Sequence, residues 1–361
     1  MHDNRLTIVL LVKGRGDFTA RWFAYAMKNQ IPFHVIVADG GKENHVERAR
    51  IDLLVGNRVS YEYLCFPEDV GFYKFYKKVQ DTLGKVVSPY VLLASNDDFI
   101  FFDSLNEDLN FLDSNPQYVA SRGSIWDLVI SGSRGADLYG QILDVSLLYR
   151  HESVIGSTAV ERIEKYSKRA NSVWHDMVRT EALRSAYESL VESQLLDYSM
   201  HESLISFYIA CCGNINRRKE PYMLHQVHDD MAAKNILVDS PAEWMCNPGW
   251  DEDLAKMASA ISAKTSASDG IDYELAKSHF LACYCKNIAL YRLRDFYATS
   301  IGESKNGLLI KNAFKRTLQA IGFGGILTLR NKIRNYLIVK DPFPLYNNEA
   351  FKRVQLFLSK K

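Results

Sequence analysis

The chain has 361 residues, of which 47% are hydrophobic and 24% charged, and its formal net charge is +1. This is ordinary for a soluble globular protein, and the length allows two domains or one enlarged domain. The six cysteines form no CxxC pair, so buried free thiols are expected rather than a disulfide framework. No apolar run reaches about 18 residues and nothing at the N-terminus resembles a signal peptide, so a cytoplasmic location without a membrane-spanning helix is expected.

The first hundred residues alternate between strand and helix patterns. Buried strands are predicted over 6–13, 32–39, 59–65 and 90–95. Between them, helices are predicted from Phe18 onward, over 42–54 and over 72–83. Strands that alternate with helices indicate a parallel sheet with βαβ crossovers.

The rest of the chain is less regular and then mostly helical. Helices are predicted over 104–115, 161–169, 180–194 and 200–212, with short strand pieces in 118–150 and extended segments at 215 and 222–226. A boundary is expected within 240–250, and 251–338 has a helical pattern. We therefore expect an α/β domain over 1–235 and a helical, basic region over 236–361.

Three of the predicted strands end in polar or glycine-rich turns: Lys13-Gly14-Arg15, Asp39-Gly40-Gly41 and Asn96-Asp97-Asp98. Right-handed crossovers bring these turns to one edge of the sheet, where ligands of open α/β sheets bind. An unpaired buried carboxylate costs several kcal/mol, so the acids that follow strand 90–95 are expected to meet a cation or ligand. The alternative is that the triplet forms a turn and N-cap for a following helix.

Four segments then carry a resemblance: Leu10–Arg15, Val35–Gly40, Pro67–Gly71 and Leu92–Phe99. In this order, over roughly residues 1–120, they resemble the motifs of GT-A-fold glycosyltransferases of the family-2 type. The resemblance implies a GT-A-like, mostly parallel mixed sheet flanked by helices. It also implies a UDP- or GDP-sugar donor and a Mg²⁺ or Mn²⁺ cofactor, which would stabilise the departing diphosphate.

The resemblance assigns donor-site roles to the motif residues. Asp39 would bind the nucleotide base, Lys13 and Arg15 the diphosphate, and Asp98 the metal. Asn96 and Asp97 would lie near the ribose or behind the metal, although the family usually has Asp at the first of these positions. Asp69 stands where the family has the Asn of its x-N-x-G turn. The alternatives are an Asx-turn at Asp39 and solvated surface charges at Lys13 and Arg15.

Residues of the second half are implied for the metal and the acceptor. Glu202 begins the helix that ends before Gly213 and resembles the family's general base, with Asp197 as the second choice; an in-line attack would invert the anomeric centre. His228 is favoured over His225 as a metal or phosphate contact. Trp174 would form a platform for an acceptor sugar. Favourable charge near a helix N-terminus, a surface histidine and a core tryptophan are the respective alternatives.

The C-terminal part is strongly basic. Residues 305–361 contain 12 Lys/Arg and two acids, a net charge of +10, so residues 1–304 carry −9. Apolar and basic residues alternate over 308–340, which is typical of an interfacial segment on an anionic leaflet or of a helical subdomain with a solvated basic face. Peripheral contact with the inner face of the membrane through 305–361 is therefore one expectation.

Together these features predict an inverting, metal-dependent glycosyltransferase. It would move a sugar to a saccharide or lipid-linked saccharide, as in surface polysaccharide or lipopolysaccharide synthesis, with no nucleic-acid partner. One alternative is a nucleotidyltransferase acting on sugar phosphates, for which Lys13–Gly16 is a short phosphate loop. The other is a non-catalytic membrane- or RNA-binding protein, although the tail lacks the signatures of common RNA modules.

Overall fold

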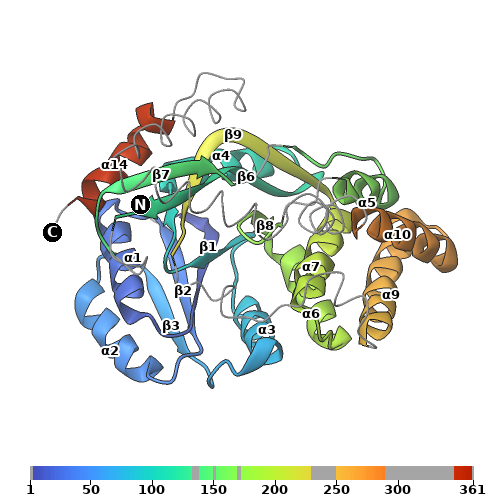
Figure 1. Cartoon of the computed structure of the whole chain (residues 1–361), viewed down its shortest axis with the longest axis horizontal. Helices are drawn as coiled ribbons and strands as arrows, with labels where there is room; N and C mark the ends of the chain where they lie inside the picture. Colours follow the sequence, from blue (N-terminus) through green and yellow to red (C-terminus); the bar gives the residue numbers. More distant parts are fainter. Residues whose placement is uncertain are drawn as a thin grey trace, which may run out of the picture.

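The computed structural model describes residues 3–131, 138–148, 152–168, 172–228, 249–288 and 345–359. Within these residues the strands form one curved nine-stranded sheet flanked by helices (Figure 1). The strand order is β3-β2-β1-β4-β8-β6-β9-β5, and β7 pairs with β6 outside this path. The mixed α/β architecture expected from the sequence is confirmed.

The N-terminal half of the sheet is parallel and is built by consecutive crossovers. Its strands are β1 (Asp3–Val12), β2 (Phe33–Asp39), β3 (Tyr61–Cys65) and β4 (Tyr90–Ser95). The crossover helices are α1 (Gly16–Lys28), α2 (Asn44–Val55) and α3 (Gly71–Leu83). These elements match the predicted strands and helices, because the apolar runs have strand length and are separated by amphipathic segments.

The second half of the sheet is mixed. Its strands are β5 (Phe99–Ile100), β6 (Tyr118–Ile130), β7 (Ile142–Leu147), β8 (Met177–Arg179) and β9 (Asn214–Gln226). β8 is antiparallel to both β4 and β6, whereas β9 is parallel to β6. The helices that accompany these strands are α4 (Phe102–Ser114), α5 (Ala159–Ser167), α6 (Thr180–Ser193) and α7 (Tyr198–Cys212).

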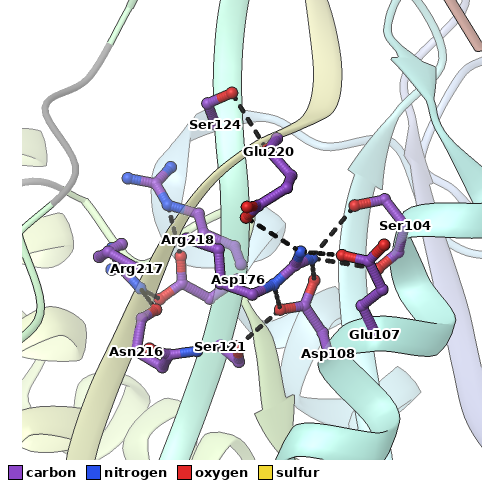
Figure 2. Close-up of polar contacts among 11 residues, drawn as sticks. Ser104, Glu107, Asp108, Ser121, Ser124, Asp176, Asn216, Arg217, Arg218 and Glu220 are labelled. Carbon is purple, nitrogen blue, oxygen red and sulfur yellow. Dashed lines mark hydrogen bonds and ion pairs between the residues drawn. The ribbon is translucent and has the colours of Figure 1, made fainter. Parts of the chain in front are cut away.

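The long strands β6 and β9 correct one expectation. Their sequences suggested short pieces, but each strand runs for 13 residues. The polar residues that interrupted the pattern have partners on both sides of β9 (Figure 2). Arg217 bonds the buried Asp176 at 2.7 Å, while the adjacent Arg218 turns to the other side and bonds Asp108 at 2.8 Å. Charged residues are tolerated inside this sheet because each finds a buried counter-charge.

The sheet separates two hydrophobic cores, and β1 contributes to both because its side chains alternate between the two faces. Ile8 and Leu10 enter one core, whereas Val9 and Leu11 enter the other. The first core is covered by α1, α2, α4 and the C-terminal α14 (Glu349–Leu358). The second is covered by α3, α5, α6, α7 and two further helices, α9 (Gly249–Asp269) and α10 (Tyr273–Asn287).

The described C-terminal helices thus pack on the sheet-containing part of the molecule (Figure 1). Phe357 of α14 contacts Tyr25 and Phe99, and a short 3₁₀ helix, η3 (Leu345–Asn347), precedes it. Most of the basic segment, including 308–340, lies outside the described residues, as does the expected boundary at 235/236. Among the described helices, none combines the length and apolar character that crossing a bilayer requires.

Candidate functional site

The carboxyl ends of β1, β2 and β4 meet at one edge of the sheet, as predicted. In the parallel register Val12 pairs with Asp39, and Leu11 pairs with Ser95. The three turns that follow these strands are therefore neighbours: the Gly40 amide donates to the Val12 carbonyl oxygen at 3.0 Å, and Asn96 donates to the Arg15 carbonyl oxygen at 3.3 Å. In a parallel sheet the turns that follow neighbouring strands lie at the same edge, so the parallel arrangement alone brings these turns together.

A pocket of about 320 Å³ opens between the first two of these turns, a size suited to a small ligand. Its lining combines cations with acids and backbone groups: Lys13, Gly14, Arg15, Gly16, Asp39, Gly41, Lys42, Glu43, Asn44, Glu47 and Glu68. Arg15 adopts a left-handed conformation with φ 56°, next to Gly14 at φ 69°. A non-glycine residue in this region is uncommon and often marks a functional turn.

Asp39 is the last residue of β2, and hydrogen bonds fix its carboxylate. It is 1% exposed, and its two carboxylate oxygens accept hydrogen bonds from the Gly41 amide at 2.7 Å and the Tyr63 hydroxyl at 2.6 Å. The bond to Gly41 is the Asx-turn expected as the alternative. Each carboxylate oxygen has a second lone pair, so this turn and ligand binding are compatible.

Asp69 lies behind this pocket rather than in its lining. Its side chain is 3% exposed and pairs with Lys78 at 2.6 Å, and its carbonyl oxygen accepts a hydrogen bond from Lys13. Its contact with Lys13 therefore runs through the main chain. Asp69 thus helps to position Lys13 without lining the pocket itself.

The acidic turn after β4 is buried and each member has different surroundings. Asn96 donates to Thr19 at 3.1 Å, while its side-chain oxygen meets no hydrogen-bond donor among the described residues. Asp97 accepts from Arg15 at 2.8 Å, and His228 Nε2 lies 2.8 Å from the same oxygen. Burial raises the pKa of Asp97, but the hydrogen bond from His228 and the charge of Arg15 outweigh burial and hold it below the usual value of an aspartate.

Asp98 is 2% exposed, and its carboxylate forms no ion pair and no side-chain hydrogen bond among the described residues. Its pKa is raised to about 7, chiefly by burial and also by the charge of Asp97, against the opposing effects of His225 and of a main-chain hydrogen bond from Gln226. A buried carboxylate without an ion-pair partner among the described residues is suited to receive a cation.

The two histidines at the end of β9 both contact aspartates. His228 follows the strand and stacks on Phe18, with ring centroids 5.2 Å apart, while it contacts Asp97. His225, which sequence reasoning did not choose, lies 3.0 Å from Asp127. Burial lowers the pKa of His225, but the charges of Asp98 and Asp127 outweigh it and raise the pKa to about 9.

The expected acceptor-side residues gather around the start of α7. Glu202, Trp174 and Asp176, together with Ser172 and Ser206, line a cavity of about 10 Å³, which has room for about one water molecule. Asp197, in contrast, is the N-cap of α7, where its carboxylate accepts from the Met200 amide at 3.0 Å. Of the two predicted bases, Glu202 therefore faces a cavity, whereas Asp197 is engaged in the cap.

The residues present fit a divalent cation in part. Asp98 supplies two carboxylate oxygens, the ligand type that Mg²⁺ and Mn²⁺ prefer. Within the described ranges no group of three or more His, Cys, Asp or Glu side chains is arranged to hold a metal ion. A cation here would need phosphate and water oxygens for its other positions, as Mg²⁺ commonly has in phosphate-binding sites.

Comparison with solved structures identifies the fold. Residues 1–349 of S. aureus TarS in complex with UDP-GlcNAc match with a TM-score of 0.52 and 12% identity, over 82% of this chain and 76% of that one. The chain has a GT-A-type fold. TarS 1–349 in complex with UDP has a TM-score of 0.48 at 13% identity, over 84% of this chain and 76% of that one. No family model and no curated protein matches the sequence.

The GT-A-like fold implied by the sequence motifs is thus confirmed. Sequence reasoning did not choose His225, and it missed three other residues that shape the site: Arg21, Tyr63 and Lys78. Arg21, 2% exposed, donates to the Asp97 carbonyl oxygen at 2.8 Å and to Gln226 at 2.6 Å. The available signal was a cation on the apolar face of a helix, since Arg21 adjoins Trp22 and follows Phe18 by three positions.

Proposed function

We propose that this chain is a glycosyltransferase that uses a nucleotide-sugar donor. The observation that carries the proposal is the pocket after β1 and β2, which Lys13, Arg15 and Asp39 line, and from which Arg15 bonds Asp97 of the acidic turn after β4. The shared fold supports it, because the TarS structure with UDP-GlcNAc contains such a donor. A UDP-sugar is therefore the first donor to test, with a GDP-sugar as the second.

In this proposal each side of the pocket binds one part of the donor. Asp39 accepts a hydrogen bond from an N–H of the base, and the amide oxygen of Asn96 accepts one from a ribose hydroxyl. Lys13 and Arg15 neutralise the diphosphate, and Asp97 with His228 holds Arg15 in its left-handed conformation. Fixed cations of this kind stabilise the negative charge that grows on the leaving group.

Asp98 and Glu202 divide the remaining chemistry. Asp98 is the residue proposed to hold Mg²⁺ or Mn²⁺; when bound, the cation would offset charge on the diphosphate. Glu202 removes the proton from the acceptor hydroxyl as that oxygen attacks the anomeric carbon, which inverts the configuration. Asp197 remains the second choice for the base. The proposed acceptor is a saccharide or a lipid-linked saccharide, as in surface polysaccharide synthesis. Residues 305–361 would make peripheral contact with the membrane.

A thermal-shift screen tests the donor part. Wild-type protein is incubated with UDP, GDP, UDP-sugars and GDP-sugars, each with Mn²⁺ and with a chelator. A bound ligand stabilises the native state in proportion to ln(1 + [L]/Kd), so the preferred base and the metal requirement appear in one experiment. No stabilisation by any nucleotide would refute the donor site.

Transfer itself is tested with Asp98→Asn, which keeps the shape of the side chain. We expect folded protein that binds nucleotide but has lost metal-dependent transfer. Full transfer by this variant, or undiminished wild-type transfer in chelator, would contradict the metal role. Release of pyrophosphate instead of a nucleoside diphosphate would favour the nucleotidyltransferase.

A further inference from the structure

Lys78, on the inner face of α3, has an unusual position for a lysine. Its side chain is 2% exposed, and Nζ donates to Asp69 Oδ2 at 2.6 Å and to the carbonyl oxygen of Val12 at 2.9 Å. Lysine is almost never fully buried unless it is paired. The neighbouring Lys77 shows the usual situation, with a side chain 47% exposed that pairs with Asp81 one helical turn later.

The two acceptors of Lys78 belong to different turns of the candidate donor site. Val12 is the last residue of β1, and its carbonyl oxygen also accepts from the Gly40 amide at 3.0 Å. Asp69 begins the approach to α3; its amide donates to the Gly40 carbonyl oxygen at 2.9 Å, and its own carbonyl oxygen accepts from Lys13. One ammonium group therefore connects the turns after β1, β2 and β3.

The packing around this connection leaves no freedom. A Cβ built on Gly40 would lie 2.3 Å from Asp69 Cγ, so the carboxylate is pressed against the backbone of the turn that carries Asp39. Lys13 reaches the pocket only from the position that its bond to Asp69 permits. If Asp69 moves, Lys13 and the Asp39 turn lose their fixed relation.

We propose that Lys78 is a positioning residue for the donor nucleotide: through Asp69 and the Val12 carbonyl it holds Lys13 and the Asp39-Gly40-Gly41 turn in their binding arrangement. This inference rests on the proposed function, because it deepens the same site. Lys78 does not line the pocket and touches no donor group itself. Its effect is to preorganise the side chains that do.

The experiment compares four proteins: wild type, Lys77→Met as the matched control, Lys78→Met, and the double variant Lys78→Met/Asp69→Asn. The probe is UDP, whose Kd is measured by calorimetry. We expect the control to bind as wild type does and Lys78→Met to bind about tenfold more weakly or worse, the scale of loss when a binding group is misplaced. Lys78→Met also leaves Asp69 buried without its counter-charge, so its unfolding midpoint falls.

The double variant separates positioning from stability. Because it removes both charges, we expect its unfolding midpoint to return toward that of wild type while UDP binding stays weak. Recovery of wild-type affinity in the double variant would overturn the proposal, since Lys78 would then only neutralise Asp69. If Lys78→Met does not fold, the double variant and the control still decide the question.

A ligand-free measurement keeps this inference distinct from the proposed function. Hydrogen exchange should accelerate in Lys78→Met and in the double variant at the amides of Gly40 and Asp69, and remain unchanged in α6. Unchanged exchange at both amides would refute the positioning role. If wild type binds no nucleoside diphosphate, the donor-site proposal fails, and the exchange data alone report whether Lys78 holds the turns together.

Discussion

His175 gives the sharpest prediction on pH dependence. It precedes β8 and is 9% exposed, its Nδ1 meets no hydrogen-bond partner among the described residues, and its ring lies 6.3 Å from that of His225. Its pKa is lowered to about 3, chiefly by burial and also by the positive charges of His225 and Arg122, against the opposing charge of Asp97. The native protein therefore keeps His175 neutral at a pH at which an exposed histidine is protonated.

The sign follows from proton binding. Below pH 6.5, the ordinary pKa of a histidine, the unfolded chain binds a proton at this position that the native protein does not bind, so the free energy of unfolding falls as the pH falls. At about pH 5, some 1.5 units below 6.5, the loss is roughly 2 kcal/mol at about 1.4 kcal/mol per unit. It continues to about pH 3, where the native histidine itself becomes protonated.

Replacement of His175 by glutamine removes this titration. Urea unfolding of wild type, His175→Gln and the exposed-histidine control His45→Gln would be followed at about pH 8 and pH 5. We expect the stability of His175→Gln relative to wild type to increase by roughly 2 kcal/mol between the two pH values, whatever the packing cost at pH 8. A relative stability that does not change with pH, or an equal change in the control, would refute the buried neutral histidine.

Three further substitutions address the site and its support. Glu202→Gln should lower transfer by about 100-fold or more with unchanged UDP binding, since it removes only a base; equal transfer rates would exclude it. Gly40→Ala should cost about 1–3 kcal/mol in urea unfolding and weaken UDP binding, because its Cβ overlaps Asp69. Arg218→Met should cost roughly 3–5 kcal/mol by stranding the buried Asp108, yet leave the Kd of UDP unchanged; a large change in Kd would contradict this separation.

The parallel half of the fold could be predicted because its information is local. The strands β1, β2 and β4 are apolar runs of strand length, and each is followed by a polar turn. Parallel register then forces those turns together, so Lys13, Asp39 and Asp98 could be assigned to one sheet edge without any contact information. The sequence showed which residue types occupy the turns, but not which residues they contact.

The mixed half could not be predicted in the same way. β6 contains Arg122 and Gly123, and β9 contains four charged residues in succession from Arg217 to Glu220, so neither has a strand-like alternation. Their strand state depends on Asp176 and Asp108, which lie far away in the sequence (Figure 2). A buried ion pair depends on tertiary contacts. The local sequence pattern therefore predicts each of its two residues to be a charged surface residue.

The same limit applies to the supports of the site. Lys77 and Lys78 are adjacent and chemically identical, yet one pairs in solvent and the other is buried against Asp69. Which of the two is buried depends on the rotation of α3 against β1 and on the turn before it. The hydrophobic periodicity of a helix shows which face is buried, but it does not resolve which of two adjacent residues is buried. It could therefore not show that the Lys78 ammonium group pairs with Asp69, the residue whose carbonyl oxygen contacts Lys13.

The contrast between Asp97 and Asp98 connects the fold to the proposed chemistry. Two adjacent buried carboxylates repel each other, and the protein supplies Arg15 and His228 to the first, while the second forms no ion pair and no side-chain hydrogen bond among the described residues. Both side chains come from elements that the sheet brings to this edge: Arg15 from the turn before α1, and His228 from just after the end of β9. Asp97 is thereby committed to holding Arg15, so the protein's own contacts leave Asp98 as the carboxylate with coordination to offer. If both acids only stabilised the fold, we would expect each to have a counter-charge within the protein. Because Asp98 lacks the ion pair that Asp97 has, replacement of Asp98 is the change that should separate nucleotide binding from transfer.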